Sequence, residues 1–412
     1  MPDRGGRTKG MSAHPFADAD ARLVAAAKDL QVLKLVAWPE SLAERFLAAW
    51  EAGRPEIPEP PPLRLHFDPP LEELDALSRP ASDHPAAQFV AETAASYAAT
   101  VRMLQGAGTP EFTRWSIELY GRPRDEVLPG GPTHLTAAER FMETTSELQG
   151  GCFVTDADLC YTPQHVRDEV DRRSQALFGD RNPRIELDDG LAAKAAAGAE
   201  RIRIRTATCF SGADLEQLWY HEACVHTATA LNGRLQPHLA TLSLNAPRTT
   251  ATQEGLATFS ELVTGSIDLA RLRRLALRVK AIDLALDGAD FIDLFKFFLE
   301  AGQGERESYY STARIFRGGD PRGGAVFTKD GVYLKGLLEV YTFLHESLAQ
   351  NRVERTRNLF AGRMTCPDVV SLEPLFEDGT VAPPRFEPDW LQRRNQLAAY
   401  LAFSSLANSL PL

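Results

Sequence analysis

Two histidines and two glutamates in the middle of the chain supply the residue types of a catalytic metal site. His221, Glu222 and His226 lie within six consecutive residues, and Glu254 follows 28 residues after His226. A catalytic zinc ion is commonly held by three histidine or carboxylate ligands, and a fourth position stays open for water. These residues therefore predict a zinc-dependent hydrolase with one Zn²⁺ per chain, and a peptidase is the first hypothesis.

The spacing of the two histidines differs from the common H-E-x-x-H motif, in which they are four residues apart. His221 and His226 are five residues apart, so a regular α-helix would turn their side chains about 140° away from each other. A π-type widening makes residues i and i+5 neighbours, and such bulges are frequent at functional sites. The spacing therefore predicts a locally widened helix over residues 221 to 226.

Flanking residues predict where this helix begins and ends. Ser211 is a suitable N-cap, and Asp214 adds an acidic residue in the first turn. Apolar residues then recur at helical intervals, which predicts one buried face. Asn232-Gly233 is a typical helix stop and predicts the end of the helix.

Glu254 is the predicted third metal ligand. The segment Thr250–Gln253 has the pattern of a capping box, so we expect a second helix with Glu254 in its first turn. His238 is an alternative third ligand, although it lies in a predicted loop with no helix to orient it. Glu222 adjoins a ligand, and we expect it to take a proton from the attacking water as the general base.

The two motifs together resemble a known family. His221-Glu222-x-x-x-His226 and Gln253-Glu254-Gly255-Leu256-Ala257 are similar to the bacterial QEGLA-motif proteins, which have been labelled modulators of flavohaemoglobin expression. They also resemble the animal microtubule-associated tyrosine carboxypeptidases, zinc enzymes that remove the terminal tyrosine of α-tubulin. The resemblance covers most of the chain. It implies His221, His226 and Glu254 as zinc ligands and Glu222 as the catalytic glutamate, and it leaves the substrate open.

Composition limits the possible partners and location. The 412 residues carry a formal net charge of −11, which argues against nucleic-acid and anionic-membrane partners because both attract basic surfaces. The five cysteines show no C-x-x-C pair and no disulfide-framework spacing, so we expect reduced thiols and a cytoplasmic location. The sequence shows neither a membrane span nor the apolar region of a signal peptide. It does not indicate the oligomeric state.

The predicted fold class is α+β, mainly α, with a gluzincin-like zinc peptidase core and a small sheet bordering the active-site cleft. We expect residues 1–14 to form a disordered tail and residues 15–412 a single catalytic domain. Residues 15–150 would form a helical scaffold with a Pro-rich arm at 53–70, and residues 151–412 the metal-binding core. Helical patterns occur at about 16–30, 40–52, 87–105, 109–120, 135–148, 162–178, 267–285, 289–301, 333–350 and 390–406.

Residues 201–206 are the clearest predicted strand, because charged and apolar residues alternate strictly. We expect it to be an edge strand next to the cleft, preceded by a short Ala-rich helix. Arg201, Arg203 and Arg205 would share one face. That face is either solvated, which discourages edge-to-edge aggregation, or a binding rim for acidic peptides.

The segment 305–324, interpreted as a glycine-rich loop, and the residues after it are candidates for substrate contacts. Arg314, Arg317 or Lys329 would bind a carboxylate, and Tyr333 would donate to the oxyanion. Alternatively, each is an ordinary surface or ion-pair residue. With a peptide or protein C-terminus as partner, the leading hypothesis is a carboxypeptidase-type zinc metallopeptidase that releases a C-terminal residue, an aromatic one if the resemblance extends to specificity. Alternatives are an aminopeptidase, an amidase, or a regulatory protein with a structural metal.

Overall fold

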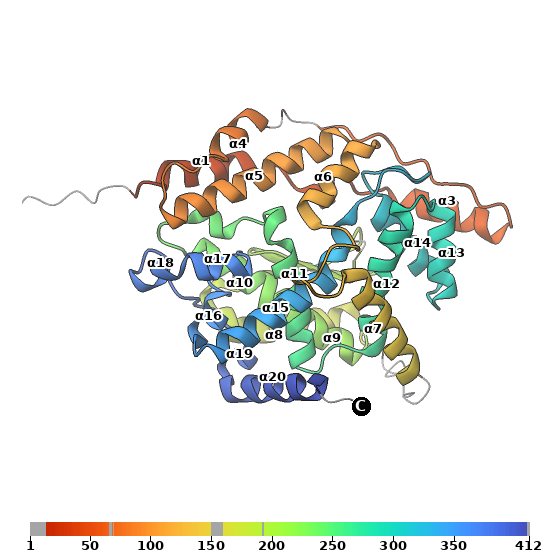
Figure 1. The fold of residues 1–412 in the computed structure, drawn as a ribbon. Coiled ribbons are helices and arrows are strands. Elements are labelled where there is room, and N and C mark those ends of the chain that lie inside the picture. The colour runs from red at the N-terminus through yellow and green to blue at the C-terminus, as the bar shows by residue number, and fades with distance from the viewer. Residues whose placement is uncertain (1–13, 66–67, 69, 150–159, 192, 410–412) are drawn as a thin grey trace, which may run out of the picture.

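The computed structural model describes residues 14–65, 68, 70–149, 160–191 and 193–409, and it shows a mainly helical α+β protein with one small sheet (Figure 1). The fold class is confirmed at this level. Apart from residue 14, the predicted tail lies outside the described residues. The described part of the Pro-rich arm, which lies between α3 and α4, contains no helix or strand, as the prolines predict.

The elements follow one another along the chain in three groups. The N-terminal helices are α1 (Ala17–Ala27), α2 (Val32–Leu35), α3 (Glu40–Glu51), α4 (Leu71–Leu77), α5 (Pro85–Gln105), α6 (Pro110–Tyr120) and α7 (His134–Gln149). The central elements are α8 (Pro163–Phe178), η2 (Gly179–Arg181), β1 (Arg184–Asp188), β2 (Ala195–Ala197), β3 (Arg201–Arg205), α9 (Gly212–Leu218), the π-helix η3 (Trp219–Thr227), α10 (Ala228–Arg234), η4 (Ala240–Ser243), η5 (Pro247–Thr249) and α11 (Thr250–Val263). The C-terminal elements are α12 (Leu269–Leu286), α13 (Phe291–Glu300), α14 (Glu305–Phe316), η6 (Thr328–Gly331), α15 (Val332–Ala349), α16 (Val353–Asn358), α17 (Cys366–Ser371), α18 (Glu373–Glu377), α19 (Asp389–Gln392) and α20 (Arg394–Ser409).

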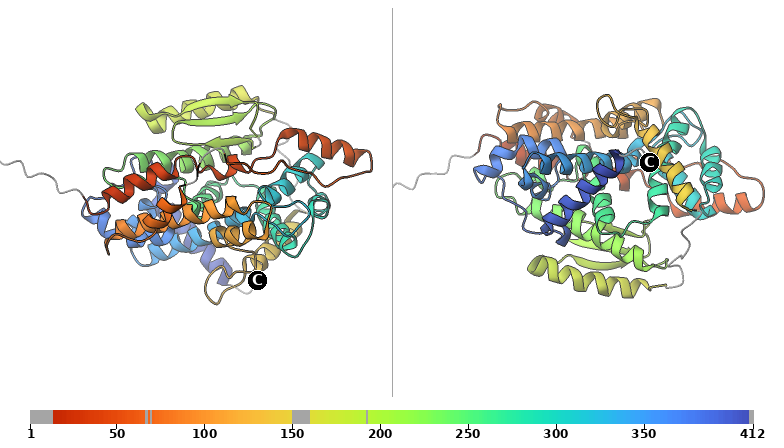
Figure 2. Two further views of the ribbon diagram at one scale, coloured as in Figure 1. Left: turned by 90° about the horizontal axis from the view of Figure 1, so that it is seen from above. Right: turned by 60° about the horizontal axis from the view of Figure 1, so that its bottom comes forward.

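The sheet has three strands in the order β1-β3-β2, with β1 parallel and β2 antiparallel to β3. The sheet and α8 form a layer on one side of the helical body (Figure 2). The predicted strand at 201–206 is confirmed, but its placement at an edge is wrong because β3 is the central strand. Arg201 and Arg203 form ion pairs with Glu186 and Asp188 of β1, at 3.7 and 3.0 Å. Both arginine side chains therefore have acidic partners on the neighbouring strand.

Three other predictions about secondary structure are wrong. The predicted Ala-rich helix is the strand β2, because its few alanines pair with β3 instead of continuing a helix. The predicted loop at 305–324 begins with the helix α14, whose apolar residues pack into a phenylalanine-rich core with α3 and α13. The predicted helix at 390–406 is interrupted at Arg393 between α19 and α20.

The cysteine prediction also needs correction. Cys160, before α8, and Cys209, before α9, form a disulfide with their Cα atoms 5.5 Å apart. Cys224 and Cys366 are free and buried. The pair is 49 residues apart in sequence, so only the tertiary structure brings the two cysteines together. In the described part of the chain, none of the helices combines the length and apolar character that crossing a membrane requires.

Two glycines set the contact between α11 and α15 at the centre of the molecule (Figure 1). A Cβ atom on Gly255 would lie 2.1 Å from the Gly336 carbonyl carbon, and one on Gly336 would lie 1.8 Å from the Ala251 carbonyl oxygen. The two backbones therefore touch, and neither position accepts a side chain. This crossing fixes the position of Glu254, the residue before Gly255, relative to the start of α15.

Candidate metal centre

The widened turn predicted around His221 and His226 is present as a π-helix. Helices α9, η3 and α10 follow one another directly, and η3 contains both histidines. Because a π-helix brings residues five apart side by side, the two imidazole rings meet edge to face with their centroids 4.8 Å apart. The predicted widening of residues 221 to 226 is confirmed.

The start of this helix agrees with the sequence, and its last residue, Arg234, lies one residue beyond the predicted stop. The Ser211 side chain accepts from the Asp214 backbone N–H, and the Asp214 side chain accepts from the Ser211 backbone N–H, which forms a capping box. The helix continues past the stop predicted at residues 232–233. Gly233 instead allows close packing, because a Cβ there would lie 2.3 Å from the Leu242 carbonyl oxygen.

Glu254 reaches both histidines from α11. The helix begins at Thr250 without a side-chain cap, so the capping box predicted at Thr250–Gln253 is wrong and Glu254 lies in the second turn. Its Oε2 atom is 3.5 Å from Nε2 of His221 and 3.6 Å from Nε2 of His226. His238, the alternative ligand, packs against His14 with ring centroids 4.5 Å apart and does not belong to this group.

These three side chains, here called the metal group (His221, His226 and Glu254), fit a metal ion. One ligand atom from each residue lies within 4.8 Å of the other two. Glu254 Oε2 is buried and has no hydrogen bond, which is unusual for a buried carboxylate oxygen and leaves it available as a ligand. Two imidazoles and one carboxylate form a donor set typical of catalytic zinc sites. The structure does not identify the metal.

A second carboxylate, Glu261, orients His221 from behind. Glu261 is fully buried, and its Oε1 atom lies 2.6 Å from Nδ1 of His221. Arg271 and Gln217 hold the same carboxylate, at 3.2 and 2.9 Å. This carboxylate–histidine contact would fix which ring nitrogen of His221 faces a bound metal. Glu261 is not among the site residues predicted from the sequence, although its position two helical turns after Glu254 places both on one face of α11.

Charges inside the metal group are balanced in part by Lys329. Lys329 Nζ donates to Glu254 Oε1 at 2.9 Å. Burial raises the pKa of Glu254, but Lys329 and the two histidines outweigh this effect and hold the pKa well below its usual range. Burial lowers the pKa of His221, but the neighbouring carboxylates of Glu254 and Glu261 outweigh this effect and raise the pKa to about 10.

Glu222 lies on the π-helix beside His221 and is half-buried. Within the part of the chain that the structure describes, its carboxylate has neither a hydrogen bond nor an ion pair. A carboxylate without a partner next to a metal group can accept a proton. The surroundings of Glu222 are therefore compatible with the general base that the sequence predicts.

The other predicted site residues gather on α14, η6 and the start of α15. Arg314 binds the buried Asp330 through two hydrogen bonds, and Arg317 lies 3.7 Å from the same carboxylate. The Tyr333 hydroxyl accepts a long hydrogen bond from Arg314, at 3.5 Å. Lys329 lies 5.0 Å from the centre of the Tyr333 ring, so this ring connects the metal group to the arginines.

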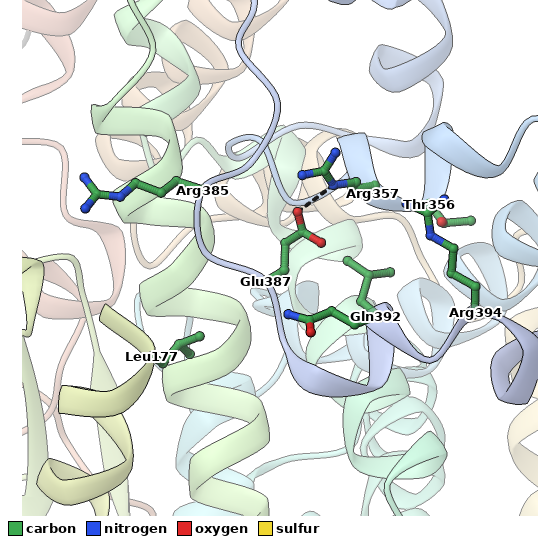
Figure 3. Close-up of a pocket in the computed structure, with 8 residues that line it drawn as sticks. Leu177, Thr356, Arg357, Arg385, Glu387, Gln392 and Arg394 are labelled. Carbon is green, nitrogen blue, oxygen red and sulfur yellow. Dashed lines mark hydrogen bonds and ion pairs between the residues drawn. The ribbon is translucent and has the colours of Figure 1, made fainter. Parts of the chain in front are cut away.

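A surface pocket of about 510 Å³ lies elsewhere, between α8 and the C-terminal helices (Figure 3). Its charged lining residues already have partners: Arg357 pairs with Glu387, Arg385 with Asp180, and Arg394 with Glu354. None of the metal group lines it. Nothing in its chemistry therefore indicates a catalytic site.

Comparisons with known proteins identify a family over most of the chain. A family model described as microtubule-associated tyrosine carboxypeptidase matches residues 44–409. No match was found among curated proteins. One similar solved structure is a protein from Colwellia psychrerythraea provisionally described as a lipoprotein, at 16% identity and a TM-score of 0.47, with 71% of this chain and 60% of that one covered. This chain thus spans about 60% of that protein's length, and a likeness this distant carries no argument about function.

Proposed function

Because the chain belongs to the microtubule-associated tyrosine carboxypeptidase family, a family of carboxypeptidase-type metallopeptidases, we propose that it is a zinc carboxypeptidase that shortens peptide or protein C-termini by one residue. The observation that carries this proposal is the metal group with its unbonded Glu254 oxygen next to the unpartnered Glu222. Zinc fits best because catalytic zinc sites combine histidine and carboxylate ligands. We further propose a gluzincin-like arrangement, with both histidines on one helix and the glutamate on the next.

The chain's own side chains would perform the proton transfers. Bound zinc would act as a Lewis acid that polarises the scissile carbonyl and lowers the pKa of the attacking water. Glu222 would accept the proton from that water and return it to the leaving amine. Tyr333 would donate its hydroxyl hydrogen to the developing oxyanion. Glu261 would hold His221 in the tautomer that leaves Nε2 free.

The positive side chains near Tyr333 support cleavage at a C-terminus. A carboxypeptidase binds a free carboxylate next to the scissile bond, whereas an aminopeptidase needs carboxylates there to bind an amine. Arg314, Arg317 and Lys329 remain proposed contributors to carboxylate binding, acting through the positive field that they create beside Tyr333. The family description suggests a C-terminal tyrosine as the preferred residue.

A peptide library with free C-termini, and matched copies with amidated C-termini, tests the proposal. The zinc-loaded protein should remove one C-terminal residue from the free peptides and leave the amidated copies intact, as measured by mass spectrometry. Glu222→Gln should retain zinc and lose turnover. The matched control is Glu216→Gln on the same helix, because Glu216 pairs with Arg173 at the surface and should not affect activity. Removal of residues from the N-terminus of the peptides, or equal cleavage of the amidated copies, would contradict the proposal.

A further inference from the structure

One arginine near the site lacks a partner. Arg271 and Arg278 are seven residues apart on α12, so both side chains lie on the same face. Arg271 pairs with Glu261 at 3.2 Å. Arg278 has no hydrogen bond and no ion pair within the described residues, and its guanidinium carbon lies 5.0 Å from the centre of the Tyr333 ring. Arg278 is therefore a cation held next to Tyr333 without a counter-ion.

Its guanidinium group is also accessible. Arg317 provides the contrast: its Nε and Nη2 atoms are buried and form no hydrogen bond. None of the Arg278 nitrogens is both fully buried and without a hydrogen bond. Because Arg278 is not hydrogen-bonded, its nitrogens must retain contact with solvent.

The neighbouring charges leave Arg278 uncompensated. Three arginines surround a single carboxylate, Asp330, and Arg314 and Arg317 are the two within ion-pair distance of it. Burial, followed by the charge of Arg314, lowers the pKa of Arg278, and although Asp330 and Tyr333 act in the opposite direction the pKa falls to about 10. The group stays charged at neutral pH. An unpaired cation in partly buried surroundings costs free energy unless an anion joins it.

We infer that Arg278 binds the free carboxylate of the substrate's C-terminal residue. The substrate would supply the anion that the arginines around Asp330 lack. The planar guanidinium can donate two parallel hydrogen bonds to a carboxylate. Tyr333 contacts both this cation and Lys329, and Lys329 holds Glu254, so a peptide end bound at Arg278 would lie close to the metal group. This inference rests on the proposed function and names the residue that recognises a free C-terminus.

The test uses binding as well as turnover. In the zinc-loaded Glu222→Gln protein, a fluorescent peptide with a free C-terminus should bind about 100-fold more tightly than its amidated copy, because two charge-assisted hydrogen bonds are lost with the amide. Adding Arg278→Ala should abolish that difference, and Arg278→Lys should retain part of it. With Glu222 present, Arg278→Ala should lower kcat/KM about 100-fold on free peptides, with zinc content unchanged.

The matched control is Arg274→Ala on the same helix, because Arg274 has only a 4.0 Å contact with Glu307; it should keep the full preference. Arg278→Ala should leave the Tm unchanged or raise it, since removing an uncompensated cation does not destabilise the fold. A free-over-amidated preference that persists without Arg278, or that is absent from the parent protein, overturns the inference even if peptides are shortened. If the preference depends on Arg278 and no peptide is shortened, the inference stands and the proposed function fails.

Discussion

The metal group and the arginines beside it have opposite imbalances of charge. Around His221 and His226, two cations of the described residues, Lys329 and Arg271, form ion pairs with the three carboxylates of Glu222, Glu254 and Glu261 that gather there. Beside the Tyr333 ring, which Lys329 also contacts, three arginines face the single carboxylate of Asp330. One region lacks a cation and the other lacks an anion. Both deficits are removed if a metal occupies the first region and a substrate carboxylate the second.

The largest expected effect comes from removing one of the three proposed metal ligands, Glu254. Glu254→Ala should lose most of its zinc and at least about 1,000-fold of its activity, because two histidines do not replace a three-ligand site. Metal analysis after dialysis and a peptide assay measure both effects. Glu216→Ala on α9 is the control and should keep its metal. Full zinc retention in Glu254→Ala, for example through His238, would contradict the ligand assignment.

The next largest effect is expected in the arginine region, where Asp330→Asn removes the negative charge that pairs with Arg314 and Arg317. Removing this carboxylate leaves the partly buried Arg314 and Arg317 without a counter-ion among the described residues, so the free energy of unfolding should fall by about 3–5 kcal/mol. The metal content should change little. Denaturant unfolding measures the loss. Asp75→Asn, which removes a partly exposed pair with Arg102, should cost less than about 1 kcal/mol.

The stabilising effect of Asp330 should also depend on pH. Burial raises the pKa of Asp330, but the nearby arginines, led by Arg314, outweigh it and hold the pKa below its usual range. A carboxyl whose pKa is lower in the folded state stabilises the fold above its unfolded pKa, about 4, and loses that contribution as the pH falls. The difference in stability between the parent protein and Asp330→Asn should therefore shrink below about pH 4. A difference that stays constant down to pH 2 would show that the ionised carboxylate is not responsible.

A smaller effect is expected from Glu261→Gln, which keeps the shape of the side chain but removes its charge. The amide can still contact His221, but it no longer favours the tautomer and basicity that a ligand needs, so zinc affinity should fall about 10- to 100-fold. Competition with a fluorescent chelator measures this affinity. Glu216→Gln is again the control. Unchanged affinity would mean that the Glu261–His221 contact positions the helices without affecting the metal.

The sequence determined the metal region to a large extent because the information is local. The five-residue spacing of His221 and His226 requires a widened helix, and Ser211 and Asp214 mark its start within a few residues. Proline and threonine likewise predicted the start of α8 at Pro163. Each of these features depends on neighbours within about one or two helical turns, where backbone geometry limits the possibilities.

The tertiary structure alone decided the second region. Arg278, Arg314 and Asp330 come from α12, α14 and η6, and nothing in the sequence indicates that Asp330 pairs with Arg314 and leaves Arg278 free. The central position of β3, the strand β2 and the Cys160–Cys209 disulfide were missed for the same reason. Pairing between segments far apart in sequence depends on how the helices and strands pack, and local propensities do not contain that information.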